Sequence, residues 1–273
     1  MAEFGAPGGE PVLYFHGFPA SRLEAQLMHG AAVNERVRLV ALDRPGFGGS
    51  DFQARTLVQW PSDVAEVADA LNLPRFAIVG VSGGAPFTLA CAAIVPSRVT
   101  AIAIVAGLGM TSIPEDLARF DWISRASIRL ARSAPPLSRT VNRALAAVLR
   151  RRPELLDTLL GADESRPDRE VLADPDVAAT LATALREALR NGSAGASHEL
   201  GVLSRFWGFD AAAIRVPCHV WHGERDCTVP IEMARRIAGL VPGCEATFLA
   251  DEGHFSLPLR HGERILRRLL QAT

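Results

Sequence analysis

The run from Phe76 to Val95, FAIVGVSGGAPFTLACAAIV, predicts a strand, a sharp turn and a helix in direct succession. Phe76 to Val81 are apolar or β-branched without polar alternation, which is typical of a strand buried on both faces of a parallel sheet. The Ala-rich residues from Gly84 to Val95 are long enough for a helix, since Pro86 fits its first turn and Pro96 follows its end. One serine occupies the turn between the two elements.

That turn, Gly80-Val-Ser-Gly-Gly84, matches the pattern G-x-S-x-G in the strand, turn and helix context that a nucleophile elbow requires. A serine held in such a turn brings the residues two before and two after it close together, so glycines at 80 and 84 leave room that side chains would fill. The N-terminus of the helix points its free N–H groups and its positive dipole end at Ser82. We therefore expect Ser82 to be a nucleophile; a Gly-rich turn with a solvent-facing serine is the alternative.

Composition and charge disfavour several other classes of protein. The chain is 48% hydrophobic and 22% charged, as in ordinary globular proteins, and 29 basic against 30 acidic residues give a net charge of −1. No overall field favours nucleic acid or an anionic membrane as a partner. No segment approaches the ~20 apolar residues of a membrane span, and the N-terminus lacks a basic region followed by an apolar run, so we expect a cytoplasmic protein.

The four cysteines form no C-x-x-C pair, so we expect free thiols and no metal site. Gly46-x-Gly48 lacks the third glycine and the following helix of a dinucleotide-binding turn. His198-Glu199 lacks the second histidine of H-E-x-x-H, so a zinc peptidase is not supported. We therefore expect no cofactor. His16, at the end of a strand, is favoured as a structural residue over a second base.

Strand and helix patterns alternate before Met110 and after Asp210, which predicts an α/β fold with a mostly parallel sheet covered by helices on both faces. At the helix that begins near Ser21, we expect Ser21 to be the N-cap and Glu24 its capping-box partner. The expected strands are 12–16, 37–42, 76–81, 99–105, 217–222 and 245–249, and the expected helices of this part are 21–33, 62–73, 84–95, 231–240 and 258–270.

The residues between these parts show helical patterns and no convincing strand. We therefore expect a core domain formed by 1–109 and 211–273, with an inserted helical cap at 110–210 over Ser82. In the cap, 191–197 is expected to be a loop. Four aromatic residues of the cap could line a pocket, although a place in its apolar core is the favoured interpretation: Phe120, Trp122, Phe206 and Trp207. The candidate helices of the cap are 114–133, 137–151, 154–160 and 176–190.

A serine hydroxyl is a weak nucleophile, so it needs a histidine to accept its proton and a carboxylate to orient that histidine. Asp226 follows the strand 217–222, and His254 follows the strand 245–249. With Ser82 they lie just past the carboxyl ends of parallel strands, where open α/β sheets place ligands. The acid is the least secure assignment, because Glu224, Asp251 and Glu252 also lie in these turns; Asp226 is preferred on geometry.

Five segments of the chain resemble successive signatures of the α/β-hydrolase superfamily: Phe15-His-Gly-Phe-Pro19, Asp43-Arg-Pro-Gly-Phe-Gly-Gly-Ser50, Gly80-Val-Ser-Gly-Gly84, Trp221-His-Gly-Glu-Arg-Asp226 and Glu252-Gly-His254. By that resemblance Ser82 is the nucleophile, Asp226 the acid and His254 the base, and the backbone N–H groups of Phe18 and Gly83 form the oxyanion hole. The superfamily often begins with an antiparallel strand pair, for which the eleven residues before Val12 leave almost no room. We therefore expect a sheet shortened at that edge.

The expected function is a cofactor-independent serine hydrolase that cleaves an ester, thioester or lactone of a small, mostly apolar molecule through an acyl-serine intermediate. Carbon–carbon bond hydrolysis, acyl transfer and perhydrolysis use the same triad and stay open, as does a receptor that binds a small molecule without turnover. Epoxide opening is disfavoured, because the related enzymes use an aspartate in the elbow and tyrosines in the cap, whereas the one tyrosine here is Tyr14 in a strand. The sequence leaves the oligomeric state open.

Overall fold

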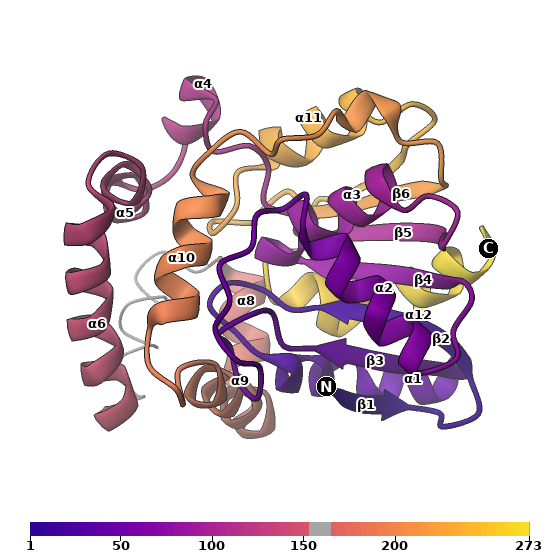
Figure 1. Ribbon diagram of the computed structural model, residues 1–273. Helices are drawn as coiled ribbons and strands as arrows, with labels where there is room; N and C mark the ends of the chain where they lie inside the picture. The colour runs from indigo at the N-terminus through magenta and orange to yellow at the C-terminus, as the bar shows by residue number, and fades with distance from the viewer. Residues whose placement is uncertain (153–164, 273) are drawn as a thin grey trace.

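The computed structural model describes residues 1–152 and 165–272, and its centre is a seven-stranded sheet in the order β1-β3-β2-β4-β5-β6-β7 (Figure 1). All neighbouring strands are parallel except β1, which is antiparallel to β3. The predicted α/β fold is therefore confirmed. The strands are β1 Ala2–Gly5, β2 Glu10–Phe15, β3 Val37–Leu42, β4 Phe76–Val81, β5 Val99–Val105, β6 Cys218–Gly223 and β7 Glu245–Leu249.

Helices cover both faces of this sheet, and each face has its own apolar core. The helices α2, α3 and α11 pack on one face, and α1, α12 and the 3-10 helix η1 pack on the other. Strand β4 runs through the middle with all six residues buried, because both of its faces are covered. The helix bounds are η1 Arg22–Met28, α1 His29–Asn34, α2 Trp60–Ala70, α3 Ala85–Ile94, α11 Ile231–Leu240 and α12 Ser256–Leu270.

The N-terminal edge of the sheet differs from the prediction. Ala2–Gly5 forms the strand β1, and its four residues pair with Arg38 to Ala41 of β3. One antiparallel strand therefore fits in the residues before Val12, where almost no room was expected for a strand pair. A four-residue strand with polar and glycine neighbours has too weak a periodic pattern to be found from sequence, and its pairing with β3 defines it.

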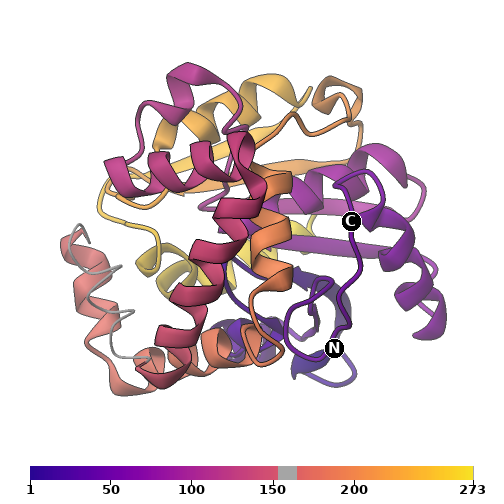
Figure 2. The same ribbon diagram turned by 60° about the vertical axis from the view of Figure 1, so that its left-hand side comes forward.

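The described part of the insertion after β5 is helical and lies at one end of the sheet (Figure 1). Helix α10 packs against α5 and α6 on one side (Figure 2), and on the other its Glu199 reaches the core. Two predictions for this region are wrong. The predicted helix 114–133 is divided into two helices, and α10 begins inside the predicted loop 191–197. The predicted helix 154–160 lies outside the described residues. The helices are α4 Pro114–Leu117, α5 Trp122–Ser133, α6 Pro135–Arg151, α8 Arg166–Leu172, α9 Pro175–Ala188 and α10 Ala194–Leu203.

Within residues 1–152 and 165–272, no helix combines the length and the apolar character needed to cross a bilayer. The cytoplasmic location stays a prediction from the sequence.

Candidate active site

Ser82 lies at the sharp turn between β4 and α3, with a positive φ of 51°. This backbone conformation is unfavourable for a residue with a side chain, and such strain is characteristic of functional turns. A Cβ atom at Gly80 would lie 3.0 Å from the Gly84 carbonyl oxygen and only 2.1 Å from Thr88 Oγ1, and one at Gly84 would lie 2.2 Å from the Phe15 carbonyl oxygen. The turn therefore needs both glycines, because α3 and β2 crowd it as well as its own two ends.

Ser82, His254 and Asp226 form one hydrogen-bonded chain. The Nε2 atom of His254 lies 3.1 Å from Ser82 Oγ, and its Nδ1 atom lies 2.8 Å from Asp226 Oδ2. The side chains of Asp226 and His254 are 0% and 6% exposed, so these bonds lie out of bulk water. The three residues predicted as a triad are thus brought together at the carboxyl ends of β4, β6 and β7.

Two of the three rival carboxylates in these turns, Asp251 and Glu252, have other partners. Asp251 pairs with Arg225 at 2.9 Å, and Glu252 lies 2.9 Å from His261 Nε2. The second oxygen of Asp226 accepts hydrogen bonds from two backbone N–H groups, those of Thr228 and Val229, both at 2.8 Å. These donors hold the Asp226 carboxylate in place and direct its other oxygen at the imidazole.

The charges of the site favour an ionised Asp226 and a basic His254. Burial alone would raise the pKa of Asp226, but the charge and hydrogen bond of His254 outweigh it and hold this pKa below its usual value. Burial would likewise lower the pKa of His254, but Asp226, Asp168 and Glu24 together raise it above its usual value. The surrounding carboxylates therefore stabilise the imidazolium that forms when a histidine accepts a proton from serine.

The backbones of Phe18 and Gly83 lie next to each other beside Ser82. A Cβ atom at Gly83 would lie 2.6 Å from Phe18 Cβ and 3.2 Å from Phe18 N. Only glycine at 83 therefore allows these two segments to approach so closely. The predicted oxyanion-hole residues are adjacent, on the loop after β2 and on the turn after β4.

Glu24 is part of this site, which the sequence did not predict. Its carboxylate does not complete a capping box; it accepts the Gly17 N–H at 2.6 Å and lines the same cavity as Ser82 and His254. Ser21 is the N-cap as predicted, although the element that follows it is the 3-10 helix η1 and α1 begins only at His29. The capping-box prediction for Glu24 is wrong because the tertiary fold brings another backbone donor, the Gly17 N–H, to its carboxylate.

Glu24 is a buried residue, 8% exposed, and the protonation of its carboxylate should make stability depend on pH. Burial raises its pKa from 4.5 to about 7, against the lowering effects of the Gly17 N–H and the charge of Arg44. Between these two pKa values the folded protein keeps a proton that the unfolded chain has lost, so stability falls as pH rises. Parent protein should lose about 3 kcal/mol of unfolding free energy relative to Glu24→Gln between pH 4 and pH 8.

Urea unfolding of both proteins across this pH range measures the difference. Glu66→Gln, which removes an exposed carboxylate from α2, is the matched control and should follow the parent. Parallel stability curves for parent and Glu24→Gln would show that Glu24 ionises normally in the folded protein.

A cavity of about 480 Å³ opens above Ser82 and His254. One wall comes from the loop after β2 and from Glu24, and the other comes from the inserted helices α8 and α9. Apart from Arg169, the insertion presents small or aliphatic side chains to this space, namely Leu172, Ala173, Ala178, Leu181, Ala182, Ala184 and Leu185. The cavity therefore suits an apolar group.

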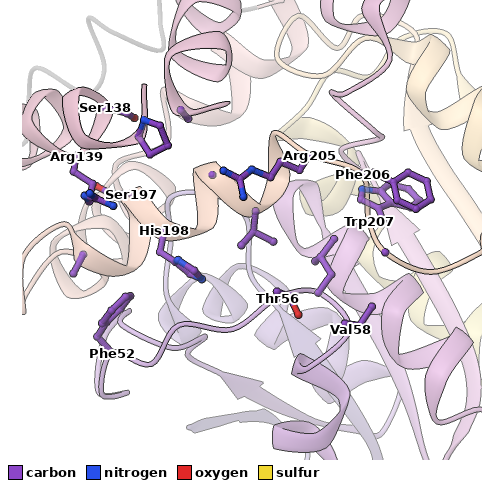
Figure 3. Close-up of a pocket in the computed structure, with 17 residues that line it drawn as sticks. Phe52, Thr56, Val58, Ser138, Arg139, Ser197, His198, Arg205, Phe206 and Trp207 are labelled. Atoms are coloured by element: carbon purple, nitrogen blue, oxygen red, sulfur yellow. The ribbon is translucent and has the colours of Figure 1, made fainter. Parts of the chain in front are cut away.

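The aromatic residues of the insertion do not line this cavity. Phe206 and Trp207 line a different one, of about 570 Å³, beside α10 (Figure 3). Phe52 and Val58, from the loop between β3 and α2, line it as well, whereas Ser82, Asp226 and His254 do not. Trp122 is 71% exposed.

The segment His198-Glu199 joins the insertion to the core. Glu199 accepts two hydrogen bonds from Arg44, both at 2.6 Å, in a buried ion pair. Arg44 also donates hydrogen bonds to the carbonyl oxygens of His16 at 2.6 Å and Gly17 at 2.9 Å. These bonds stabilise the loop that carries Phe18. Burial and the charge of Arg44 hold the pKa of His16 well below its usual value, so His16 is neutral, as suits a structural residue.

Comparisons with known proteins agree with this architecture. A profile of the alpha/beta hydrolase fold matches residues 10–260. An alpha/beta hydrolase fold protein from Nakamurella multipartita superposes with a TM-score of 0.70 at 24% identity, covering 99% of this chain and 94% of that one. A thermophilic esterase from Thermogutta terrifontis superposes with a TM-score of 0.69 at 19% identity, covering 99% and 90%. At these identities the likeness shows the fold alone.

One curated relative matches over a shorter stretch. The dihydrolipoyllysine-residue acetyltransferase component of an acetoin cleaving system from Pseudomonas putida is 32% identical over 110 residues. This match covers 40% of the chain and 30% of the relative's length.

Proposed function

Because the chain belongs to the alpha/beta hydrolase fold family, we propose that it is a serine hydrolase that cleaves an ester, thioester or lactone of a small, mostly apolar molecule. Ser82 is the nucleophile, His254 the base and Asp226 the acid, with the N–H groups of Phe18 and Gly83 as the oxyanion hole. The hydrogen-bonded chain from Ser82 Oγ through the imidazole to Asp226 Oδ2 carries the proposal.

In the proposed reaction His254 Nε2 takes the proton from Ser82 Oγ as this oxygen attacks the carbonyl carbon. The carbonyl oxygen becomes an anion that the N–H groups of Phe18 and Gly83 stabilise, and each such donor is worth about 3 to 4 kcal/mol in comparable sites. The imidazolium then gives its proton to the leaving group, which leaves an acyl group on Ser82. His254 then takes a proton from a water molecule, whose oxygen attacks the acyl carbon. The bond between this carbon and Ser82 Oγ breaks, the imidazolium returns its proton to Oγ, and the acid is released.

The proposal needs no cofactor, since the chain itself supplies nucleophile, base and oxyanion donors. The proposed domains are a core of residues 1–109 and 211–273 and a cap of residues 110–210. Two features support this division: the described insertion is helical, and its helices α8 and α9 form one wall of the cavity over Ser82. The same wall supports a small-molecule substrate with an apolar acyl or alkyl group.

A series of chromogenic esters of rising acyl length tests both the reaction and the pocket. Parent protein should hydrolyse short and medium esters. Ala182→Phe, which fills the cavity from α9, should reduce kcat/KM for a hexanoyl ester by at least about 10-fold while acetyl ester turnover stays within about 3-fold, because methylenes that no longer fit lose about 1 to 3 kcal/mol of transition-state binding.

The matched control is Ala179→Phe, an exposed position on the same helix that does not line the cavity. It should behave as the parent does. A parent protein that turns over none of these esters, yet binds a small molecule tightly, would contradict the hydrolase and favour the receptor.

A further inference from the structure

A carboxylate from the insertion holds the backbone of His254. Asp168 on α8 accepts hydrogen bonds from three successive N–H groups of the core: that of His254 at 2.8 Å through Oδ2, and those of Phe255 at 2.9 Å and Ser256 at 2.8 Å through Oδ1. Ser256 is the first residue of helix α12, and the N-cap residue Phe255 makes no side-chain capping bond. Asp168 therefore caps α12 from 86 residues away in the chain.

The surroundings of Asp168 are shaped to admit this contact. The residue is 1% exposed, and Ser165 Oγ donates a further hydrogen bond to Oδ2 at 3.1 Å. A Cβ atom at Gly253 would lie 2.2 Å from Asp168 Oδ2, so the residue before His254 must be glycine for the carboxylate to reach the backbone. A negative charge at the N-terminus of α12 also interacts favourably with the helix dipole.

We propose that Asp168 is a positioning residue, which holds His254 in line with Ser82 and makes this alignment depend on the docking of α8 against the core. The inference rests on the proposed function, because it assigns Asp168 to the base of that reaction. Two anchors then hold His254: Asp226 binds the ring, and Asp168 binds the backbone. Removing the second anchor lets the loop shift while the ring bond to Asp226 persists.

The second link between α8 and α12 provides a control. Arg260 of α12 pairs with Glu170 of α8 at 2.9 Å, and both side chains are exposed, 37% and 47%. Glu170→Gln removes this link from the same helix and touches no backbone group of the His254 loop. If the replacement of Asp168 acted only by weakening the contact between α8 and the core, the replacement of Glu170 should have the same effect.

The test compares Asp168→Asn with Glu170→Gln in the full chain. Asp168→Asn should lower kcat by about 10²-fold with KM within about 3-fold, since displacements of about 1 Å in a catalytic group have effects of this size. Glu170→Gln should stay within about 2-fold in both constants. Equal kcat values for Asp168→Asn and parent would overturn the proposal.

The pH profile of kcat/KM gives a readout that a purely structural role would not move. The charged groups that face His254 are Asp226, Asp168 and Glu24, and His222 contacts Asp226. Asp168 is one of the carboxylates that raise the pKa of His254, so the rise of activity with pH should begin at lower pH in Asp168→Asn. A lower melting temperature with an unshifted profile would contradict the assignment.

Hydrogen exchange in the parent protein decides the question should Asp168→Asn fail to fold. The amides of His254, Phe255 and Ser256 should exchange as soon as α8 leaves the core, because their acceptor leaves with it. Protection that outlasts the exchange of α8 would overturn the proposal. A parent that hydrolyses no ester and does not react at Ser82 refutes the proposed function, whereas an active parent with a fully active Asp168→Asn refutes only the role of Asp168.

Discussion

Replacing Ser82 by alanine should lower kcat for ester hydrolysis by about 10⁶-fold, close to the effect of removing a whole triad. Alanine has no oxygen to attack the carbonyl carbon, so the acyl-serine intermediate cannot form. The fold should be unaffected, because alanine and serine both carry a Cβ atom and meet the positive φ at 82 on similar terms. Catalysis that remains would come from the oxyanion hole and from binding alone.

Reaction with an organophosphonate probe measures the same site without a substrate. The parent should be labelled covalently at Ser82, since a base-activated serine beside an oxyanion hole attacks phosphorus as it attacks a carbonyl carbon. Ser62→Ala, which removes an exposed hydroxyl from α2, is the control and should be labelled as the parent is. Labelling that persists in Ser82→Ala would place the nucleophile elsewhere, and activity abolished by a chelator would argue against a metal-independent mechanism.

Replacing Asp226 by asparagine should lower kcat by about 10⁴-fold while the fold persists. The N–H groups of Thr228 and Val229, both 2.8 Å from Oδ1, require an acceptor, so the amide oxygen should take that position. The amide NH₂ group then faces His254 Nδ1, so this nitrogen must act as an acceptor. The neutral ring therefore carries its proton on Nε2 instead. That proton points at Ser82 Oγ, and the imidazole can no longer deprotonate the serine.

Steady-state kinetics with Asp251→Asn as the matched control tests this assignment. The Asp251 side chain is 85% exposed and pairs with Arg225, so its variant should stay within about 2-fold of the parent. Activity of Asp226→Asn within about 10-fold of the parent, together with a collapse in Asp251→Asn or Glu224→Gln, would move the acid and leave the roles of Ser82 and His254 intact.

The parallel core of the fold could be predicted because its signals are local. The strands 37–42, 76–81, 99–105 and 245–249 and the helix 231–240 have the bounds that the sequence predicted. Buried strands of a parallel sheet are short apolar runs between turn residues, and a helix packed on the sheet repeats its apolar face every three or four residues. These patterns lie within one element and need no knowledge of its neighbours.

Predictions failed where a segment takes its structure from a distant partner. Ala2–Gly5 becomes a strand by pairing with β3, and Glu24 leaves its expected capping position to bind the Gly17 N–H. Helix α10 begins at Ala194, inside a Gly- and Ser-rich stretch that favours a loop on composition. There Glu199 pairs with the buried Arg44, and tertiary contact outweighs the weak local preference.

By itself, the sequence determined the α/β class, the sharp turn at Ser82 and the order in which Ser82, Asp226 and His254 follow their strands. Short motifs carry this information, because a turn of given backbone geometry demands particular residues at fixed spacing. Only the tertiary structure decided that Asp168 caps the helix after His254, that Glu24 lies beside Ser82, and that α8 and α9 line the cavity. A carboxylate can bind any N–H group that the fold brings within about 3 Å, so its partner depends on the packing of the whole chain and leaves no local pattern.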